Sequence, residues 1–191
     1  MTAQSPQVVV IGASAGALEA LSVILPALPA DFALPILLVV HIPGDKRSVL
    51  ADLFRAKCRI SVIEAEDKEP VLPGTAYFAP PNYHMLLEAN GTLSLSSDEA
   101  VMFSRPSIDV LFESAADALG PAALGIVLTG ANHDGAKGLR AIMEAGGQCI
   151  VQDPETAFQA AMPQGAIAIC PDARIMPLDG IAAYLQKASC P

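Results

Sequence analysis

Runs of consecutive β-branched and other apolar residues recur along the chain and alternate with stretches of helical periodicity. Residues 8–11 and 35–40 are two such runs, and each predicts a strand that is covered on both faces. Helices are expected at about residues 17–28 and 46–56, and a further strand at residues 60–63. Buried strands separated by helices predict an α/β fold, with a doubly wound, mostly parallel sheet and helices on both faces.

The middle of the chain has a different pattern. The segments "GTAYFAP" (74–80), "HMLLEA" (84–89) and "TLSLSS" (92–97) are short, and an Asn-Gly pair at residues 90–91 separates the last two. An Asn-Gly pair between two short strands is a strong hairpin signal. We therefore expect an antiparallel hairpin insertion near residues 74–97, packed on an edge of the parallel sheet.

The alternation of strands and helices resumes after this insertion, beginning with a helix that Ser107 is expected to cap. The segments expected next are a strand at "ALGIVLTG", a helix at residues 135–145, a strand at "QCIVQ", a helical turn at residues 163–167 and a closing helix at residues 181–188. No repeat or long linker divides the chain. Residues 1–191 are therefore predicted to form one domain, with a core from about residue 8 to residue 183.

The composition narrows the functional classes. A net charge of −9 argues against binding to nucleic acid or to an anionic membrane surface. No signal peptide is visible, and the longest apolar stretch, residues 32–40, is about half of the ~20 residues that a membrane span needs. The four cysteines lie far apart, with no Cys-x-x-Cys pair and no histidine at metal-ligand spacing. We therefore expect a cytoplasmic protein with free thiols and no bound metal.

Basic residues are concentrated in one segment. Five of the eleven lie close together, at Lys46, Arg47, Arg55, Lys57 and Arg59. A solvated helix face explains this cluster, and so does a docking patch for a partner with Arg47 and Arg55 as contact residues. Both interpretations stay open at this point.

Reactive side chains follow three of the predicted strands. Ser14 follows the first strand, His41 follows the second, and Asp134 lies in the loop "LTGANHDGAKGL" after a later one. Ligands of an open parallel sheet bind beyond the carboxyl ends of its strands, where the strand order reverses. A hydroxyl, an imidazole and a carboxylate at that edge are the parts of a nucleophile, its base and the acid that orients the base.

Each of these residues also has a purely structural explanation. Ser14 and Asp134 are each suited to cap the helix that follows, and His41 could be a buried histidine bonded to the backbone. His133 is a rival base, but its side chain should diverge from that of its neighbour Asp134, so His41 is preferred. His84, in the hairpin insertion, is expected at the surface.

The glycine-rich loop at residues 12–16 also admits a phosphate-binding function. It lacks the full G-x-G-x-x-G pattern of dinucleotide-binding loops, has His41 where a ribose-binding acid is expected, and contains no Walker G-K-[ST] sequence. Its G-x-S-x-G pattern does not fit an α/β-hydrolase either, because in that fold the nucleophile lies well into the chain and the histidine comes last. A nucleotide-binding module stays as the weaker alternative.

Six segments stand out together: "VIGASAGALEAL", "VVHIP", "YFAPPNYHMLLE", "RPSIDVLFESAA", "VLTGANHDGAKGL" and "QDPETAFQAAMPQGAI". In this order and spacing they resemble the catalytic domain of CheB-type chemoreceptor glutamate methylesterases, from about Val8 to Ala183. The resemblance implies a serine hydrolase of two-component chemotaxis signalling, built on a doubly wound α/β sheet. Such enzymes remove methyl esters from glutamate side chains of chemoreceptor signalling helices and deamidate certain glutamines.

The resemblance also implies roles for single residues. The nucleophile is Ser14, the base is His41 and the orienting acid is Asp134, in agreement with the interpretation from the strand ends. The implied oxyanion region and the apolar pair at the mouth of the site comprise Ala15, Gly16, Ala131, Met162 and Pro163. No metal or organic cofactor is implied, and the implied partners are methylated chemoreceptor-type signalling proteins.

The chain departs from the common pattern of this family at several positions. Ala15 and Ala17 replace a threonine and a glycine beside the nucleophile, and Ala131-Asn132 replaces a Met-Gly pair. These changes keep open a second function, a docking or regulatory module without chemistry. No receiver domain precedes the first predicted strand, so we expect a domain that is active on its own or controlled by a regulator acting in trans.

Overall fold

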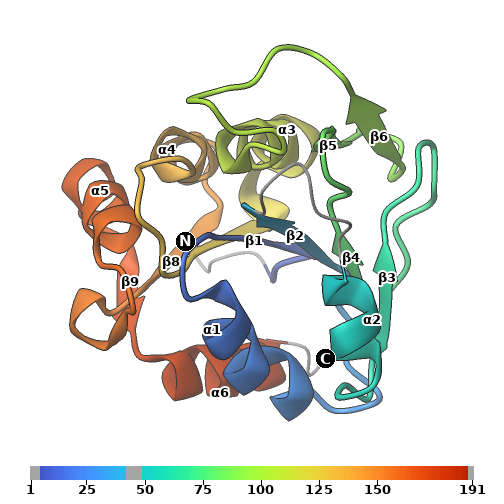
Figure 1. Ribbon diagram of the computed structural model, residues 1–191, viewed down its shortest axis with the longest axis horizontal. Coiled ribbons are helices and arrows are strands. Elements are labelled where there is room, and N and C mark those ends of the chain that lie inside the picture. Colours follow the sequence, from blue (N-terminus) through green and yellow to red (C-terminus); the bar gives the residue numbers. More distant parts are fainter. Residues whose placement is uncertain (1–4, 42–48, 189–191) are drawn as a thin grey trace.

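Within residues 5–41 and 49–188, which the computed structural model describes, seven strands form one parallel sheet (Figure 1). Their bounds in chain order are β1 (Val8–Ala13), β2 (Ile36–Val40), β3 (Ser61–Glu64), β4 (Thr75–Phe78), β7 (Ala123–Val127), β8 (Gln148–Gln152) and β9 (Arg174–Met176). Their spatial order is β3-β4-β2-β1-β7-β8-β9. Strands β5 (His84–Leu87) and β6 (Leu93–Ser96) pair antiparallel in a separate small sheet.

Helices cover both faces of the parallel sheet (Figure 1). One face carries α1 (Ala17–Ile24), α2 (Leu50–Arg55) and α6 (Leu178–Ala188). The opposite face carries α3 (Ile108–Leu119), α4 (Ala136–Glu144) and α5 (Ala161–Ile169), with the β5–β6 hairpin beside α3. Short 3₁₀ turns at η1 (Leu25–Ala27), η2 (Gly120–Ala122) and η3 (Pro154–Thr156) connect these elements.

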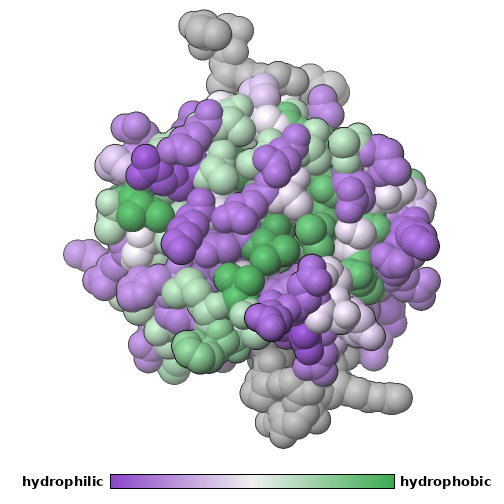
Figure 2. All heavy atoms as spheres, turned by 90° about the horizontal axis from the view of Figure 1, so that it is seen from above, coloured by the Kyte–Doolittle hydropathy of each residue, from purple (hydrophilic) through white to green (hydrophobic). Residues whose placement is uncertain are grey.

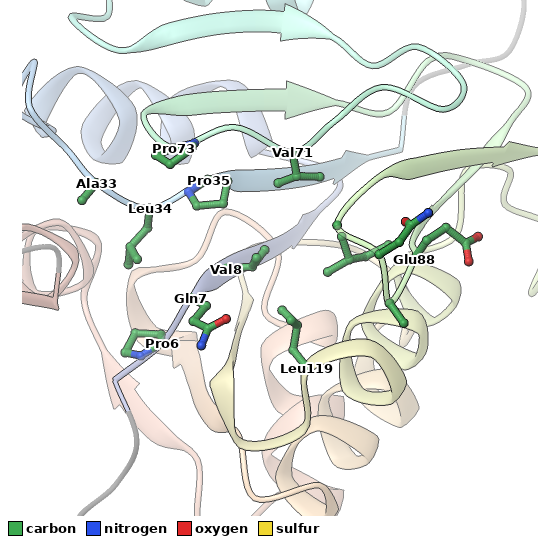
Figure 3. A pocket seen from close by; sticks show the side chains of 14 residues that line it. Pro6, Gln7, Val8, Ala33, Leu34, Pro35, Val71, Pro73, Glu88 and Leu119 are labelled. Atoms are coloured by element: carbon green, nitrogen blue, oxygen red, sulfur yellow. The ribbon is translucent and has the colours of Figure 1, made fainter.

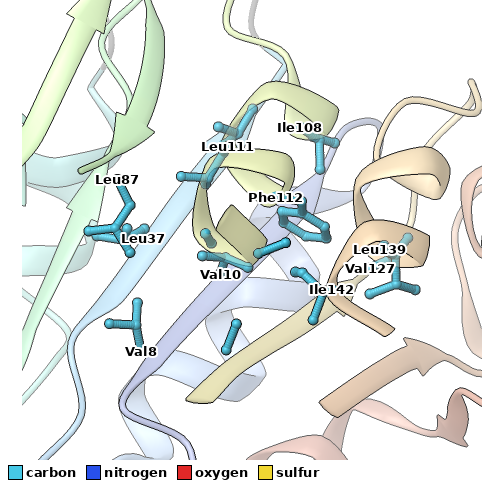
Figure 4. Close-up of a cluster of buried hydrophobic side chains, with 14 of the residues drawn as sticks. Val8, Val10, Leu37, Leu87, Ile108, Leu111, Phe112, Val127, Leu139 and Ile142 are labelled. Atoms are coloured by element: carbon cyan, nitrogen blue, oxygen red, sulfur yellow. The ribbon is translucent and has the colours of Figure 1, made fainter. Parts of the chain in front are cut away.

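Successive residues of the central strands supply two separate cores. All six residues of β1 are buried, because both faces of the sheet are covered. Val10 packs with Leu111 and Phe112 of α3 and with Ile142 of α4 (Figure 4). Ile11, one residue further, belongs to the core under α1 and α6. This arrangement explains why the first strand has a continuous apolar sequence instead of an alternating one.

The predicted fold class is confirmed, with one difference in the middle of the chain. The segment Thr75–Phe78 was expected in the antiparallel insertion, but β4 pairs parallel with both β2 and β3. All four residues of β4 are buried, as befits an inner strand covered on both faces. The antiparallel hairpin is therefore limited to β5 and β6, with Gly91 at φ 78° in its turn.

Other boundaries differ from the prediction in smaller ways. Helix α3 follows Ser107 as expected, and the hydroxyl of Ser107 accepts the N–H of Val110 at 3.5 Å. Helix α5 extends the predicted turn in both directions, and β9 was not predicted because its three residues are largely exposed at the sheet edge. The expected helix at residues 46–56 is found as α2, and residues 46–48 lie outside the described residues.

The path of the chain places a topological switch point beside β1. From β1 the chain builds β2, β3 and β4 on one side, and then returns to the other side as β7. The strand order therefore reverses between β1 and β7, where open α/β sheets bind their ligands. A Cβ on Gly12 would lie 2.2 Å from the Ile108 side chain, so this glycine lets α3 begin directly over the end of β1.

The face that α3 and α4 present is mostly hydrophilic, with a small group of apolar side chains near its middle (Figure 2). In the part of the chain that the structure describes, no helix combines the length and the apolar character required to span a bilayer.

Candidate active site

Ser14 lies on a tight turn between β1 and α1. Its N–H donates to the carbonyl of Thr129 at 2.9 Å, which ties the turn to the loop after β7. Gly16 precedes α1 with φ 84°, a left-handed conformation that favours glycine. The Ser14 hydroxyl has no hydrogen bond to any described residue and does not cap α1. The partly exposed hydroxyl is therefore available for other chemistry.

His41 lies beside Ser14 at the end of β2. The β1–β2 register pairs Ala13 with Val40, so the next residues, Ser14 and His41, follow neighbouring strands. The N–H of His41 donates to the carbonyl of Ala13 at 3.1 Å, which fixes the backbone of the histidine against β1. Its imidazole is 12% exposed, and Nε2 lies 2.8 Å from Oδ2 of Asp134. The ring is thus oriented by a carboxylate and not by backbone carbonyls.

Asp134 is a fully buried carboxylate at the start of α3. Besides the His41 bond, its oxygens accept the hydroxyl of Ser107 at 2.9 Å and the N–H groups of Ile108 at 2.7 Å and Asp109 at 3.0 Å. Burial alone would raise its pKa, but the bonds from His41 and from the N–H groups of Asp109 and Ile108 hold the pKa of Asp134 below its usual value. The lowered pKa favours the ionised form of this carboxylate, which accepts the hydrogen bond of the His41 ring.

The structural explanation of Asp134 as a cap of the helix that follows it is wrong, because its side chain does not cap α4. That place is taken by Asp109 of α3, whose Oδ1 accepts the N–H groups of Gly135 at 2.9 Å and Gly138 at 2.7 Å. Asp134, which precedes α4 in the chain, thus binds the first turn of α3, and Asp109 of α3 binds the first turn of α4. Only glycine fits at position 138, since a Cβ there would lie 2.5 Å from the Phe112 side chain.

We expect Asp109→Asn to remove a pH-dependent loss of stability. Burial raises the pKa of Asp109 to about 6, against an ordinary value of 3.8. Between these pH values the folded protein binds a proton that the unfolded chain has lost, so this group makes stability fall as pH rises from about 4 to 6. Asparagine keeps an oxygen for the two N–H groups and cannot ionise. Relative to the wild type, the variant should gain about 2 kcal/mol between pH 4 and pH 7.

Urea unfolding of both proteins at pH 4, 5, 6 and 7 measures this difference. The comparison between variant and wild type cancels the titration of the other groups, which both proteins share. A difference in unfolding free energy that stays constant across this range would contradict the assignment of the pH dependence to Asp109.

Asn132 is a site residue whose contact the sequence did not reveal. Its side-chain Oδ1 accepts the N–H of Asp134 at 3.1 Å, and its Nδ2 lies 3.3 Å from Nδ1 of His41. The sequence showed that Asn132 departs from the family pattern, but it gave no sign that the amide contacts His41.

The other two histidines lie away from this constellation. His133 is turned toward α5, where its ring packs against Gly165 closely enough that a Cβ there would lie 2.4 Å away. His84 was expected at the surface, but it is buried, with its Nδ1 accepting the N–H of Ser107 at 3.1 Å and its Nε2 lying 3.0 Å from the carbonyl of Glu99. This expectation was wrong because α3 and the segment before it cover the hairpin.

Of the predicted oxyanion residues, Ala15 and Gly16 follow Ser14 in its turn, and Ala131 lies in the loop after β7 to which this turn is bonded. The backbone N–H groups of Ala15, Gly16 and Ala131 have no hydrogen-bond partner within the described part of the chain. Thr129 fastens this region, because its hydroxyl donates to the carbonyl of Ala15 at 2.8 Å. Phe158, which is 72% exposed and was not predicted as a site residue, packs against Gly16.

Met162 and Pro163 are buried at the start of α5. The N–H of Met162 donates to the carbonyl of Gly130 at 2.9 Å, and a Cβ on Gly130 would lie 2.7 Å from the methionine sulfur. Met162 therefore packs under the loop 130–132, and both residues are buried instead of lining an exposed entrance to the site.

A hollow of about 540 Å³ lies far from this constellation (Figure 3). It is lined by residues at the amino ends of the strands, among them Val8 of β1 and Pro35 before β2, and by Leu119 at the end of α3. A second hollow of about 310 Å³ adjoins Gly16 and Phe158, next to the turn that holds Ser14. Only the second hollow shares residues with the candidate active site.

The remaining predicted features lie outside the active site. Arg55 bonds Asp52 at 2.7 Å and the carbonyl of Val62 at 3.1 Å on the exposed side of α2, and Arg47 lies outside the described residues. No group of three or more potential metal ligands occurs within residues 5–41 and 49–188. Cys58, Cys149 and Cys170 are free thiols.

The CheB methylesterase family model matches residues 9–185. A Leptospira interrogans protein, provisionally named a protein-glutamate methylesterase/protein-glutamine glutaminase, is 46% identical over 176 residues, which are 92% of this chain and 91% of that protein. A Geobacter metallireducens protein-glutamate methylesterase/protein-glutamine glutaminase is 42% identical over 95% of this chain. The chain spans about half of that relative, 52% of its length.

The crystal structure of the Thermotoga maritima CheB methylesterase catalytic domain has the same fold. It superposes with a TM-score of 0.91 at 34% sequence identity, over 96% of this chain and 99% of that domain. The chain belongs to the CheB methylesterase family.

Proposed function

We propose that this chain is a protein-glutamate methylesterase that acts through Ser14, His41 and Asp134, and that it also deamidates glutamine side chains. The observation that carries this proposal is the hydrogen bond between His41 and the buried carboxylate of Asp134, beside a serine whose hydroxyl has no hydrogen bond to any described residue. A buried carboxylate that orients an imidazole next to a free hydroxyl is the arrangement by which serine hydrolases activate their nucleophile.

The geometry assigns distinct tasks to the two imidazole nitrogens. Because ionised Asp134 can only accept, the Nε2 of His41 carries the hydrogen, and Nδ1 keeps its lone pair. In the proposed first step, Nδ1 takes the proton of the Ser14 hydroxyl while Oγ attacks the carbonyl carbon of the methyl ester. Asp134 then stabilises the imidazolium.

The second half of the reaction uses the same groups. The tetrahedral intermediate expels methanol, which takes the proton from Nδ1, and leaves a glutamyl ester on Ser14. Water, deprotonated by His41, cleaves this ester and releases the glutamate carboxylate and the free serine. With a glutamine side chain, ammonia takes the place of methanol.

The oxyanion of these intermediates requires donors that are free in the resting protein. The N–H groups of Ala15, Gly16 and Ala131, which no described residue accepts, support an oxyanion hole between the nucleophile turn and the loop after β7. Each such donor is typically worth about 10²–10³ in rate.

The proposed partners are methylated chemoreceptor-type signalling proteins in the cytoplasm. Arg47 and Arg55 keep their proposed docking role, as basic contacts for acidic receptor helices on a chain of net charge −9. Replacing both with glutamate should lower kcat/KM and its dependence on salt, whereas unchanged values in a salt titration would leave only the solvated helix face.

Methanol release from carboxyl-methylated receptor membranes tests the proposed function. The purified chain should release methanol, and the Ser14→Ala variant should not. Release by neither protein would contradict the esterase and favour the docking module. Stabilisation of the fold by common nucleotides, measured as a shift in melting temperature, would instead favour the nucleotide-binding alternative.

A further inference from the structure

In the resting structure, Nδ1 of His41 is bonded to the wrong group for catalysis. The proposed mechanism needs this nitrogen to accept the proton of Ser14, yet the amide Nδ2 of Asn132 lies 3.3 Å from it. The Ser14 hydroxyl has no hydrogen bond to any described residue. The nucleophile and Asn132 therefore stand in competition for one nitrogen.

The orientation of the Asn132 amide is fixed by its other bond. Its Oδ1 accepts the N–H of Asp134 at 3.1 Å, so the NH₂ group must be the end that faces His41. A neutral imidazole with its hydrogen on Nε2 has a single lone pair on Nδ1. A hydrogen bond from Asn132 uses the lone pair that would accept the Ser14 proton.

Asn132 is not needed to set the tautomer of His41. The carboxylate of Asp134, only 2.8 Å from Nε2, already requires the hydrogen on that nitrogen. The Asn132 contact is also longer than the usual 2.7–3.2 Å range and involves a partly exposed side chain between two exposed neighbours, Ala131 and His133. Such a contact is weak and its side chain has room to leave.

We infer that Asn132 is a positioning residue that withholds Nδ1 of His41 from Ser14 in the resting protein, and that a bound substrate must displace it. This inference rests on the proposed function, because it needs Ser14 and His41 to act as nucleophile and base. The reaction of Ser14 is then slowed in the resting protein, because the weak hydrogen bond from Asn132 to His41 must first break.

Two variants separate the hydrogen bond to His41 from the structural bond to Asp134. Asn132→Ser keeps an oxygen for the N–H of Asp134, but its side chain is too short to reach Nδ1. Asn132→Asp keeps that oxygen and the size of the side chain, but presents a carboxylate to Nδ1 and favours an imidazolium that cannot accept a proton. A merely structural role of Asn132 would not give these variants opposite effects.

Their reaction with an alkyl fluorophosphonate measures the Ser14–His41 pair without a receptor. The Oγ–P bond forms, the P–F bond breaks, fluoride leaves and the serine proton passes to His41, and intact mass follows the rate. Asn132→Ser should react about two- to tenfold faster than the wild type, the worth of one neutral hydrogen bond. Asn132→Asp should react more slowly than the wild type.

Each outcome of this experiment decides. A rate for Asn132→Ser equal to or below that of the wild type, or an Asn132→Asp variant as fast as Asn132→Ser, overturns the role of Asn132 and leaves the proposed function standing. A wild type that does not react, or a Ser14→Ala variant that does, overturns both. Thermal melting checks that each variant is folded.

Discussion

Ser14→Ala is expected to reduce methanol release by about 10⁴–10⁶-fold while the protein folds as before. The loss is large because the hydroxyl forms the covalent intermediate, and no other described nucleophile lies at the end of β1. Folding should be unaffected because the hydroxyl makes no hydrogen bond to any described residue, and the N–H of Ser14, which bonds Thr129, stays in place. Initial rates on carboxyl-methylated receptor protein measure the loss, and thermal melting measures the fold.

Ser61→Ala is the matched control for this variant. Ser61 is an exposed serine on the edge strand β3, so its loss should leave both activity and melting temperature at their wild-type values. Methanol release by Ser14→Ala at more than a hundredth of the wild-type rate would show that another group performs the attack, and would contradict the role of Ser14 as the nucleophile.

Asp134→Asn should lower kcat by about 10⁴-fold, the loss seen when the orienting acid of a serine–histidine pair becomes an amide. An amide NH₂ facing Nε2 would force the hydrogen of His41 onto Nδ1, so the base could no longer accept the proton of Ser14. The same amide can no longer accept every bond that the two carboxylate oxygens accept from Ser107 and the α3 backbone. We therefore expect a second effect, a destabilisation of about 1–3 kcal/mol in urea unfolding.

Asp179→Asn serves as the control, since Asp179 is an exposed carboxylate in the first turn of α6 on the opposite face of the sheet. It removes the same charge from a helix N-terminus without touching His41, so its kcat should match the wild type. If Asp134→Asn kept kcat within tenfold of the wild type, the carboxylate would be a cap for α3 and not the orienting acid.

Much of the fold could be predicted because the inner strands are continuous apolar runs. Val8–Ala13 and Ile36–Val40 are buried throughout, so their sequences allow no other placement, and the residues that follow them had to lie at one edge of the sheet. The same pattern could not place Thr75–Phe78, because a strand of only four residues suits an inner parallel position and a hairpin equally well.

The contacts within the site depend on packing between distant segments. Neither the capping of α4 by Asp109 nor the burial of His84 has a local signal, because each arises where α3 meets the loop after β7 or the hairpin. The Asn132–His41 contact joins residues 91 positions apart. Sequence patterns identify the reactive residue types, whereas the third dimension decides which atoms they meet.

The reciprocal hydrogen bonds of Asp109 and Asp134 to the first turns of α4 and α3 couple the stability of the site to that of the whole domain. Asp134 closes the first turn of α3 and Asp109 closes the first turn of α4, so neither helix can fray from its N-terminus without opening the other. The amide protons of Ile108 and Gly138 should consequently exchange with solvent only in openings close to global unfolding. Asp134, the proposed orienting acid, is thus part of the most cooperative unit of the protein. Local openings that need less free energy than global unfolding should leave its alignment with His41 intact.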